Sequence, residues 1–153
     1  MKALYTVALF ILISNPAFAI EKKQTKGFDL NLEVTQKIIK NAMACGEKNG
    51  WKFSVAIVNS EGNLISFERA DGAYTGSIDA SIAKATSSNA FQRPTKSFAD
   101  AVKDGRLGLL SVKNVVAVEG GLPIVSNGKH IGAIGVSGAK AIEDEECAKF
   151  ALE

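Results

Sequence analysis

Few side chains of this sequence are suited to redox, metal or acid–base chemistry, and they are scattered along it. The chain has a single histidine, His130, and its two tyrosines are Tyr5 and Tyr74. No histidine–cysteine cluster has the spacing of a zinc site. A serine–histidine–carboxylate triad would need His130, and no GxSxG nucleophile elbow accompanies it. The composition therefore argues against a zinc enzyme and against a serine hydrolase.

The segment GSIDASIAKATSSNAFQRPTKSF, residues 76–98, is the first candidate for ligand binding. On a helix, Lys84 and Ser88 share one face because they are one turn apart. Arg93 precedes Pro94, whose ring restricts the backbone, and a fixed guanidinium suits carboxylates and phosphates. The alternative is that these charges only form surface salt bridges or interactions at helix ends.

The stretch EGGLPIVSNGKHIGAIGVSGA, residues 119–139, is the second candidate. Its glycines do not match a dinucleotide-binding fingerprint, because no first βαβ unit or acidic partner accompanies them. The helix expected after Ser137 and Gly138 offers free backbone N–H groups to an anion. Close packing of strands or subunits is the favoured explanation of the glycines. His130 lies beside the Asn127–Gly128 turn and is expected to be an exposed hairpin residue or a metal ligand.

The first residues predict export. Lys2 precedes an apolar run, and Ala17–Phe18–Ala19 fits a cleavage site, so residues 1–19 are predicted to be a secretory signal peptide. The mature chain, residues 20–153, would be a single domain in the periplasm or outside the cell. The formal charge of +2 falls to +1 without Lys2, which gives no electrostatic footprint for nucleic acid. No second long apolar segment predicts membrane insertion.

The two cysteines, Cys45 and Cys147, lie near the two ends of the mature chain. In an exported protein such a pair favours a disulfide. The alternative is two free thiols buried in apolar helix faces.

Hydrophobic periodicity and turn signals predict an α+β domain with a mostly antiparallel, five-stranded sheet and helices on its faces. Asn31 is expected to cap the first helix, and Ser77 and Thr95 the second and third. The expected helices cover residues 31–48, 77–91, 95–103 and 141–152, and the expected strands cover 53–57, 64–69, 112–118, 122–126 and 130–136.

Taken together, these segments resemble one family. The run GWKFSVAIVNSEGNLISFERADGA, the two candidate segments above and a following DEECA are similar in order and spacing to the GlcG/HbpS-like haem-binding or haem-degrading domains. The same domain resembles the C-terminal module of PduO-type corrinoid adenosyltransferases. The resemblance covers residues 28–151. One departure is Asn59, where the family commonly has an aspartate.

The resemblance implies a profilin-like fold, homo-oligomers from dimer to octamer, and haem binding in exported members. It also implies that a threonine near the middle helices contributes to haem coordination, and Thr95 in QRPT is the matching position. The family's glycine-rich motif corresponds here to Gly120, Gly121, Pro123, Gly132, Gly135, Ser137 and Gly138.

Haem iron usually takes histidine, cysteine, methionine or tyrosine. Met43 is expected in the core, which leaves Tyr74 and His130, with Thr95 as a weak ligand. Haem binding would then be exchangeable rather than permanent. The predicted ligand-binding residues are Arg93, Thr95, Tyr74, Gly120, Gly121, Ser137 and Gly138, and the predicted metal ligands are Thr95 and His130.

Three functions stay open at this point. The first is an exported protein that binds haem or another tetrapyrrole, as a scavenger or as part of a sensor. The second is an oligomeric module that binds another small metabolite, such as a carboxylate, near Arg93 and the helix after Ser137. The third is an enzyme that degrades haem or acts on a small organic substrate, for which no catalytic residue is assigned.

Overall fold

A computed structural model describes residues 30–153, so the predicted signal peptide lies outside the described residues. The sheet is antiparallel throughout, in the order β2-β1-β4-β3. The elements in chain order are α1 (Leu32–Asn49), β1 (Ser54–Asn59), β2 (Leu64–Arg69), α2 (Gly76–Phe91), α3 (Lys96–Lys103), the 3-10 helix η1 (Leu107–Ser111), β3 (Gly121–Ser126), β4 (Lys129–Ser137) and α4 (Ala141–Ala151).

The α+β class is confirmed, but the sheet has four strands among the described residues rather than the predicted five. The error lies at residues 112–118, whose valines favour a strand locally. This segment instead passes α2, where the Val116 N–H donates to the Ser87 hydroxyl at 3.0 Å. Asn114 has φ 67°, which interrupts extended backbone. Tertiary contacts with a helix therefore replaced strand pairing.

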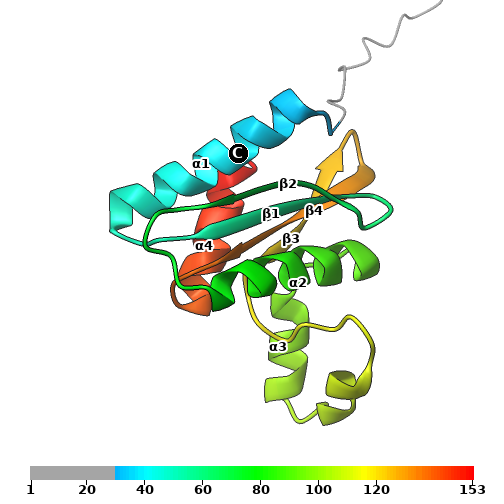
Figure 1. Cartoon of the computed structure of the whole chain (residues 1–153). Coiled ribbons are helices and arrows are strands. Elements are labelled where there is room, and N and C mark those ends of the chain that lie inside the picture. Colours follow the sequence, from blue (N-terminus) through cyan, green and yellow to red (C-terminus); the bar gives the residue numbers. More distant parts are fainter. Residues whose placement is uncertain (1–29) are drawn as a thin grey trace, which may run out of the picture.

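Helices cover both faces of the sheet (Figure 1). On one face, α1 and α4 pack on a core of large aliphatic and aromatic side chains, including Phe53, Ile57 and Ile134. On the other face, α2 packs on small residues such as Ala56 and Ala133. These small side chains let the backbone of α2 lie close to the sheet.

Gly135 of β4 shows how close α2 lies. A Cβ atom on Gly135 would collide with the Ser81 carbonyl oxygen and with the backbone nitrogen of Ala85. At Gly135 the glycine therefore allows close packing of β4 against α2, which is the explanation that the sequence analysis favoured.

Helix starts follow the predicted caps only in part. The Asn31 Oδ1 accepts from the Val34 N–H at 3.0 Å, so the predicted cap of α1 is confirmed. The predicted Ser77 cap is wrong, because α2 begins at Gly76 with Thr75 at the cap position. Ser77 lies inside the first turn, and its hydroxyl donates backward to the Tyr74 carbonyl oxygen at 2.6 Å.

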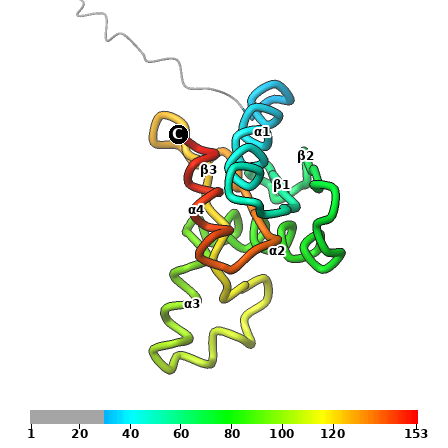
Figure 2. Tube along the Cα trace, turned by 90° about the vertical axis from the view of Figure 1, so that its left-hand side faces the viewer, coloured from blue at the N-terminus to red at the C-terminus, as the bar shows by residue number. Residues whose placement is uncertain are grey.

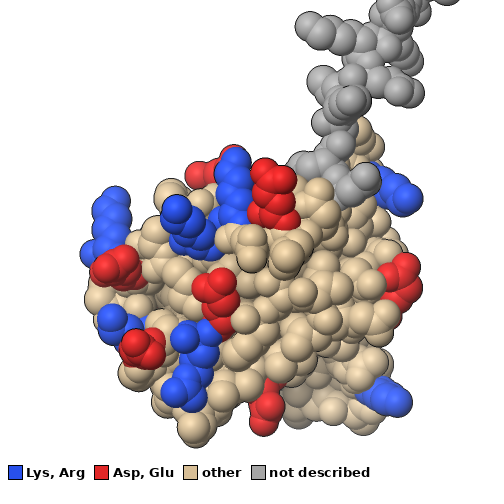
Figure 3. Space-filling view, turned by 45° about the horizontal axis from the view of Figure 1, so that its top comes forward, with Lys and Arg blue, Asp and Glu red and all other residues tan. Residues whose placement is uncertain are grey.

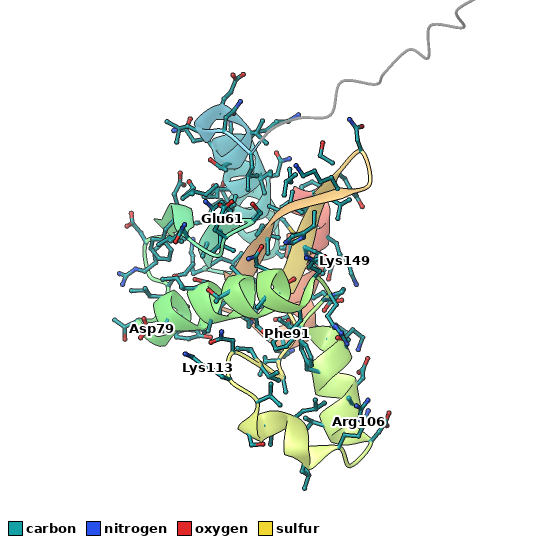
Figure 4. All side chains as sticks on the ribbon, turned by 90° about the vertical axis from the view of Figure 1, so that its right-hand side faces the viewer. Glu61, Asp79, Phe91, Arg106, Lys113 and Lys149 are labelled. Atoms are coloured by element: carbon teal, nitrogen blue, oxygen red, sulfur yellow. A yellow bond between two sulfur atoms is a disulfide. The ribbon has the colours of Figure 1, made fainter. Side chains whose placement is uncertain are left out.

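Residues 96–118 form an arm that projects from the body (Figures 1 and 2). Its base is closed by Thr95 and Gly121, which are joined by backbone and side-chain hydrogen bonds. Figure 4 shows Arg106 toward the far end of the arm and Phe91 near its junction with α2. Several apolar side chains on or beside the arm are exposed, namely Leu107, Leu110, Val112 and Val118.

Cys45 of α1 and Cys147 of α4 are joined as a disulfide, with their Cα atoms 5.6 Å apart. Both side chains belong to the core on the α1 and α4 face of the sheet. The link fixes the closing helix to the opening helix. The presence of the bond in the purified protein stays a prediction, and intact mass before and after reduction is the measurement that checks it.

Charges are mixed on the part of the surface that Figure 3 draws. Lysine and arginine side chains lie among acidic ones, separated by broad uncharged areas. Within residues 30–153, no helix combines the length and the apolar character that crossing a bilayer requires.

Candidate functional site

An open cleft of about 520 Å³ lies at one end of the sheet, and we call it the Tyr74 cleft. Its walls come from three connecting segments: the α1–β1 loop (residues 50–52), the β2–α2 loop (residues 72–74) and the β4–α4 turn with the start of α4 (residues 138–140 and Glu143). Segments distant in the sequence therefore meet here. The Tyr74 side chain is 56% exposed, so its phenol is accessible to a ligand.

Serine hydroxyls behind the cleft hold the Tyr74 loop in place. The Ser77 hydroxyl donates to the Tyr74 carbonyl oxygen at 2.6 Å, and it lies 2.7 Å from the Ser54 hydroxyl. Since the Ser77 proton is used, Ser54 is the donor in the second bond. These bonds are buried or half-buried, so they fix the loop backbone while the Tyr74 ring stays exposed.

The charged groups of the cleft are two lysines and one glutamate, Glu143, and this excess of positive charge favours an anionic ligand. Lys52 and Lys140 both line it and both are exposed. The Lys140 ammonium has only a long ion pair, 3.4 Å from a Glu143 carboxylate oxygen. Trp51 adds a half-buried aromatic surface. The dipole of α4 is met by its own first turn, because the Glu143 and Asp144 carboxylates accept from the Lys140 and Ala139 N–H groups.

A buried ion pair stands directly behind the β4–α4 turn. The Lys84 ammonium donates to Asp144 Oδ2 at 2.7 Å and to the Val136 carbonyl oxygen at 3.0 Å. The other oxygen, Asp144 Oδ1, accepts from the Ala139 N–H at 2.9 Å. Lys84 is 3% exposed and Asp144 is 2% exposed. Burial raises the pKa of Asp144, and Lys84 and the Ala139 N–H oppose that rise.

The structure brings only some of the predicted ligand residues together. Tyr74 and Gly138 line the cleft, and Ser137 is buried immediately before it. Gly120 and Gly121 lie deeper, since Cβ atoms there would meet Lys84. None of the other predicted residues, Arg93, Thr95 and His130, lines the cleft.

Thr95 is fully buried at the base of the arm. Its hydroxyl oxygen accepts from the Gly121 N–H at 2.9 Å, and its own N–H donates to the Gly121 carbonyl oxygen at 2.9 Å. Arg93 is exposed, and its guanidinium carbon lies 5.5 Å from the centre of the Phe98 ring. Both residues therefore have structural contacts in this arrangement.

His130 lies at the start of β4, the end of that strand away from the Tyr74 cleft. Its Nε2 is 2.7 Å from Asn89 Oδ1, and the Asn89 amide donates to the Ser60 carbonyl oxygen at 3.2 Å. Because Oδ1 must accept, Nε2 carries the proton. His130 Nδ1 is then buried with no hydrogen-bond partner among the described residues. Desolvation lowers the pKa of His130.

The sequence analysis placed Lys84 in a candidate segment but did not identify its partner. Asp144 lies 60 positions later in the closing helix, and no local pattern links the two. Within residues 30–153, no group of three or more histidine, cysteine, aspartate or glutamate side chains is gathered as a metal site.

Comparisons with known proteins agree with the resemblance seen in the sequence. The Escherichia coli K12 protein GlcG is 31% identical over 108 residues, which cover 71% of this chain and 81% of GlcG. A Citrobacter freundii protein, the uncharacterized 15.0 kDa protein of the dhaT-dhaS intergenic region, is 36% identical over 102 residues, covering 64% of this chain and 72% of that protein.

Two solved structures share the fold. A double mutant of Streptomyces reticuli HbpS superimposes with a TM-score of 0.75 at 28% identity, covering 99% of this chain and 97% of HbpS. A PduOC:haem complex superimposes with a TM-score of 0.74 at 23% identity, covering 82% of this chain and 94% of PduOC. The family model described as "Haem degrading protein HbpS-like" matches residues 30–153, and the chain therefore belongs to the HbpS-like family.

Proposed function

We propose that this protein binds haem, or a closely related tetrapyrrole, in the Tyr74 cleft. The family description names haem, and a protein of the same fold was solved as a haem complex. The observation that carries the proposal is local: the cleft combines an exposed tyrosine with two exposed lysines and an aromatic wall.

The residues of the cleft fit the parts of a haem. A tyrosine phenolate is a known haem-iron ligand, and Tyr74 is the tyrosine in the described part of the chain. The ammonium groups of Lys52 and Lys140 suit the two propionates, and the indole of Trp51 suits the edge of the macrocycle. The cleft is open rather than enclosed, so binding would be exchangeable.

Thr95 and His130 are weaker candidates as iron ligands. Iron could reach the Thr95 hydroxyl only after the base of the arm opened, because that oxygen is buried against Gly121. The remaining ring nitrogen of His130 is buried as well. Coordination by either residue would need a rearrangement, whereas coordination by Tyr74 would not.

Titration of the purified protein with hemin tests the proposal. A Soret shift that saturates at micromolar hemin is expected. Tyr74→Phe should remove the tyrosinate bands of ferric haem while keeping the ring, and Lys52→Gln with Lys140→Gln should weaken affinity. His130→Gln is the matched control and should change neither. An absent spectral shift in the wild-type protein would exclude the proposal. If His130→Gln or Thr95→Ala alone abolished the Soret shift, the haem site would lie at that residue and not in the Tyr74 cleft.

The carboxylate-binding alternative keeps one supporting observation, the two lysines beside the first turn of α4. The sequence analysis combines Arg93 with that helix for this alternative, but Arg93 does not line the cleft. Calorimetric titration with small mono- and dicarboxylates, without hemin, separates the alternatives. Heat that Lys140→Gln removes, together with no Soret shift, would favour a carboxylate module.

Haem degradation is the third candidate, and it is supported by the family description. The test is loss of the Soret band when the loaded protein receives a reductant and oxygen. Turnover of several equivalents of hemin per protein would indicate an enzyme. Loss of one equivalent or none would indicate a binding protein.

Export and self-association are further parts of the proposal. Export rests on the predicted signal peptide in residues 1–19 and is tested by fractionation with N-terminal sequencing. A homo-oligomer, from dimer to octamer, is supported by the exposed Leu107 and Leu110 of the arm. Light scattering after gel filtration should give a mass above the monomer, and Leu107→Ser with Leu110→Ser should lower it.

A further inference from the structure

The buried Lys84–Asp144 pair is not explained by stability alone. Removing two charges from water costs more than their attraction returns unless the geometry is good, and buried pairs can often be replaced by apolar residues without loss of stability. Apart from the bond between the two charges, the hydrogen bonds of the pair go to backbone groups on either side of the β4–α4 turn. The pair therefore calls for an explanation in terms of what it holds.

The groups that the pair holds border the Tyr74 cleft. Lys84 fixes the Val136 carbonyl near the end of β4, and Asp144 fixes the Ala139 N–H. Ala139 and its neighbours Gly138 and Lys140 line the cleft. Asp144 also lies in the first turn of α4, where its own N–H donates to the Lys140 carbonyl at 2.9 Å. The pair thus joins α2 to both ends of the turn that forms one wall.

Glycine makes room for this arrangement. Gly120 has φ 113°, and a Cβ there would lie 3.0 Å from the Lys84 ammonium, 2.9 Å from Asp144 Cβ and 2.7 Å from the Val136 oxygen. A Cβ on Gly121 would collide with the Lys84 carbonyl. Gly120 and Gly121, which the sequence analysis assigned to ligand binding, therefore pack directly against the ion pair.

We propose that Lys84 and Asp144 are positioning residues that hold the residue 138–140 turn and the first turn of α4 in the conformation that receives the ligand. This inference rests on the proposed function, since the ligand is the one proposed for the Tyr74 cleft. Neither side chain touches that ligand. The pair acts through the Ala139 N–H, and so sets where the Lys140 ammonium stands before binding.

A pair of double variants isolates this role. Lys84→Met with Asp144→Leu replaces the ions by apolar side chains and removes the acceptor of the Ala139 N–H. Lys84→Met with Asp144→Asn also removes both charges but keeps an amide oxygen for that N–H. The first should bind hemin roughly three- to tenfold more weakly than the second, the size of one lost neutral hydrogen bond. Ile124→Ala, a core variant in β3 that does not line the cleft, controls for general destabilisation.

Hydrogen exchange of the free protein provides a second measurement that needs no ligand. Exchange at Ala139 and in the first turn of α4 should accelerate in the Leu variant and stay near wild type in the Asn variant. Equal hemin affinity and equal exchange in both variants would overturn the inference. An affinity loss that Ile124→Ala reproduces at equal stability would also overturn it. If the wild-type protein does not bind hemin, the proposed function fails, and the exchange experiment still tests the positioning of the turn.

Discussion

The two ends of β4 are tied to α2 by different polar chemistry. At the Tyr74 cleft the tie is the buried Lys84 of α2, which donates to the Val136 carbonyl of β4 and forms an ion pair with Asp144 of α4. At the opposite end it is a neutral chain from His130 through Asn89 to Ser60. Of these two ends of β4, the one with buried charge is the end where a backbone turn forms the wall of the Tyr74 cleft. At the other end, the Asn89 amide of α2 bonds the His130 imidazole of β4 and the Ser60 carbonyl after β1, and none of these groups carries a charge.

The comparison shows how a helix can be fixed without an apolar face. The buried residues of α2 are mostly small or polar, and its packing partners on the sheet include Ala56, Ala133 and Gly135 beside Val58. Close approach supplies contact area, and polar bonds from Lys84 and Asn89 set the position along the sheet. Variants at the two ends should therefore differ in size of effect.

The largest expected effect concerns α4, which the ion pair holds on one side and the disulfide on the other. Reducing the Cys45–Cys147 bond should lower the free energy of unfolding by about 4–5 kcal/mol in the chain-entropy model, because the closed loop is long. Guanidinium unfolding with and without reductant measures this. Intact mass after alkylation supplies the control. Two alkylated thiols without prior reduction would show that the bond is absent from the purified protein.

Breaking the charged tie should come next. Lys84→Met alone leaves the Asp144 carboxylate buried without its cation, and should cost about 3–5 kcal/mol. Adding Asp144→Leu should recover much of that loss, because the unpaired charge is gone. Chemical denaturation of both variants measures the difference. A single variant as stable as the double variant would show that the pair is not the main tie at this end.

Breaking the neutral tie should cost less. Asn89→Ala removes the acceptor of His130 Nε2 and the donor to the Ser60 carbonyl, and should cost about 1–3 kcal/mol. Hemin affinity should not change, because Asn89 does not line the cleft. Ser87→Ala is the comparison variant: Ser87 lies two residues earlier in α2, is also buried, and loses only its bond from the Val116 N–H. If Asn89→Ala costs more than Lys84→Met, the order of the two ends is reversed.

Local signals predicted most of the fold. Asn31 caps α1, and Asn127 and Gly128, with φ 52° and 74°, form the tight turn expected of that dipeptide in a hairpin. The strand expected at residues 112–118 was wrong, because its neighbour in space is α2 and not a strand. Propensity reports what a segment favours alone, and here a contact from Ser87 decided otherwise.

The candidate site was less predictable than the fold. Tyr74 could be singled out by its rarity, but its meeting with Lys52 and Lys140 depends on how three turns converge. The Lys84–Asp144 pair joins residues 60 positions apart, so sequence periodicity carries no trace of it. Thr95 and the paired glycines were chosen through family resemblance, and the structure places them around buried packing contacts. Long-range geometry decided each of these points.

The smallest expected effect is a pH dependence at the neutral end. Burial lowers the pKa of His130 below the ordinary value of 6.5, so the unfolded chain binds a proton more readily than the folded protein. Stability should therefore be complete above pH 6.5 and fall as the pH drops below it, until the folded histidine is itself protonated. His130 is the only histidine, so His130→Phe should remove the histidine contribution to the slope between pH 7 and pH 5. Asp144, whose pKa is raised, contributes the opposite slope, because the folded state binds its proton more readily. Subtracting the His130→Phe curve from the wild-type curve cancels that contribution. A difference that stays flat between pH 7 and pH 5 would mean that protonation leaves the tie from His130 to Asn89 intact, and that the two ends differ in charge but not in sensitivity to acid.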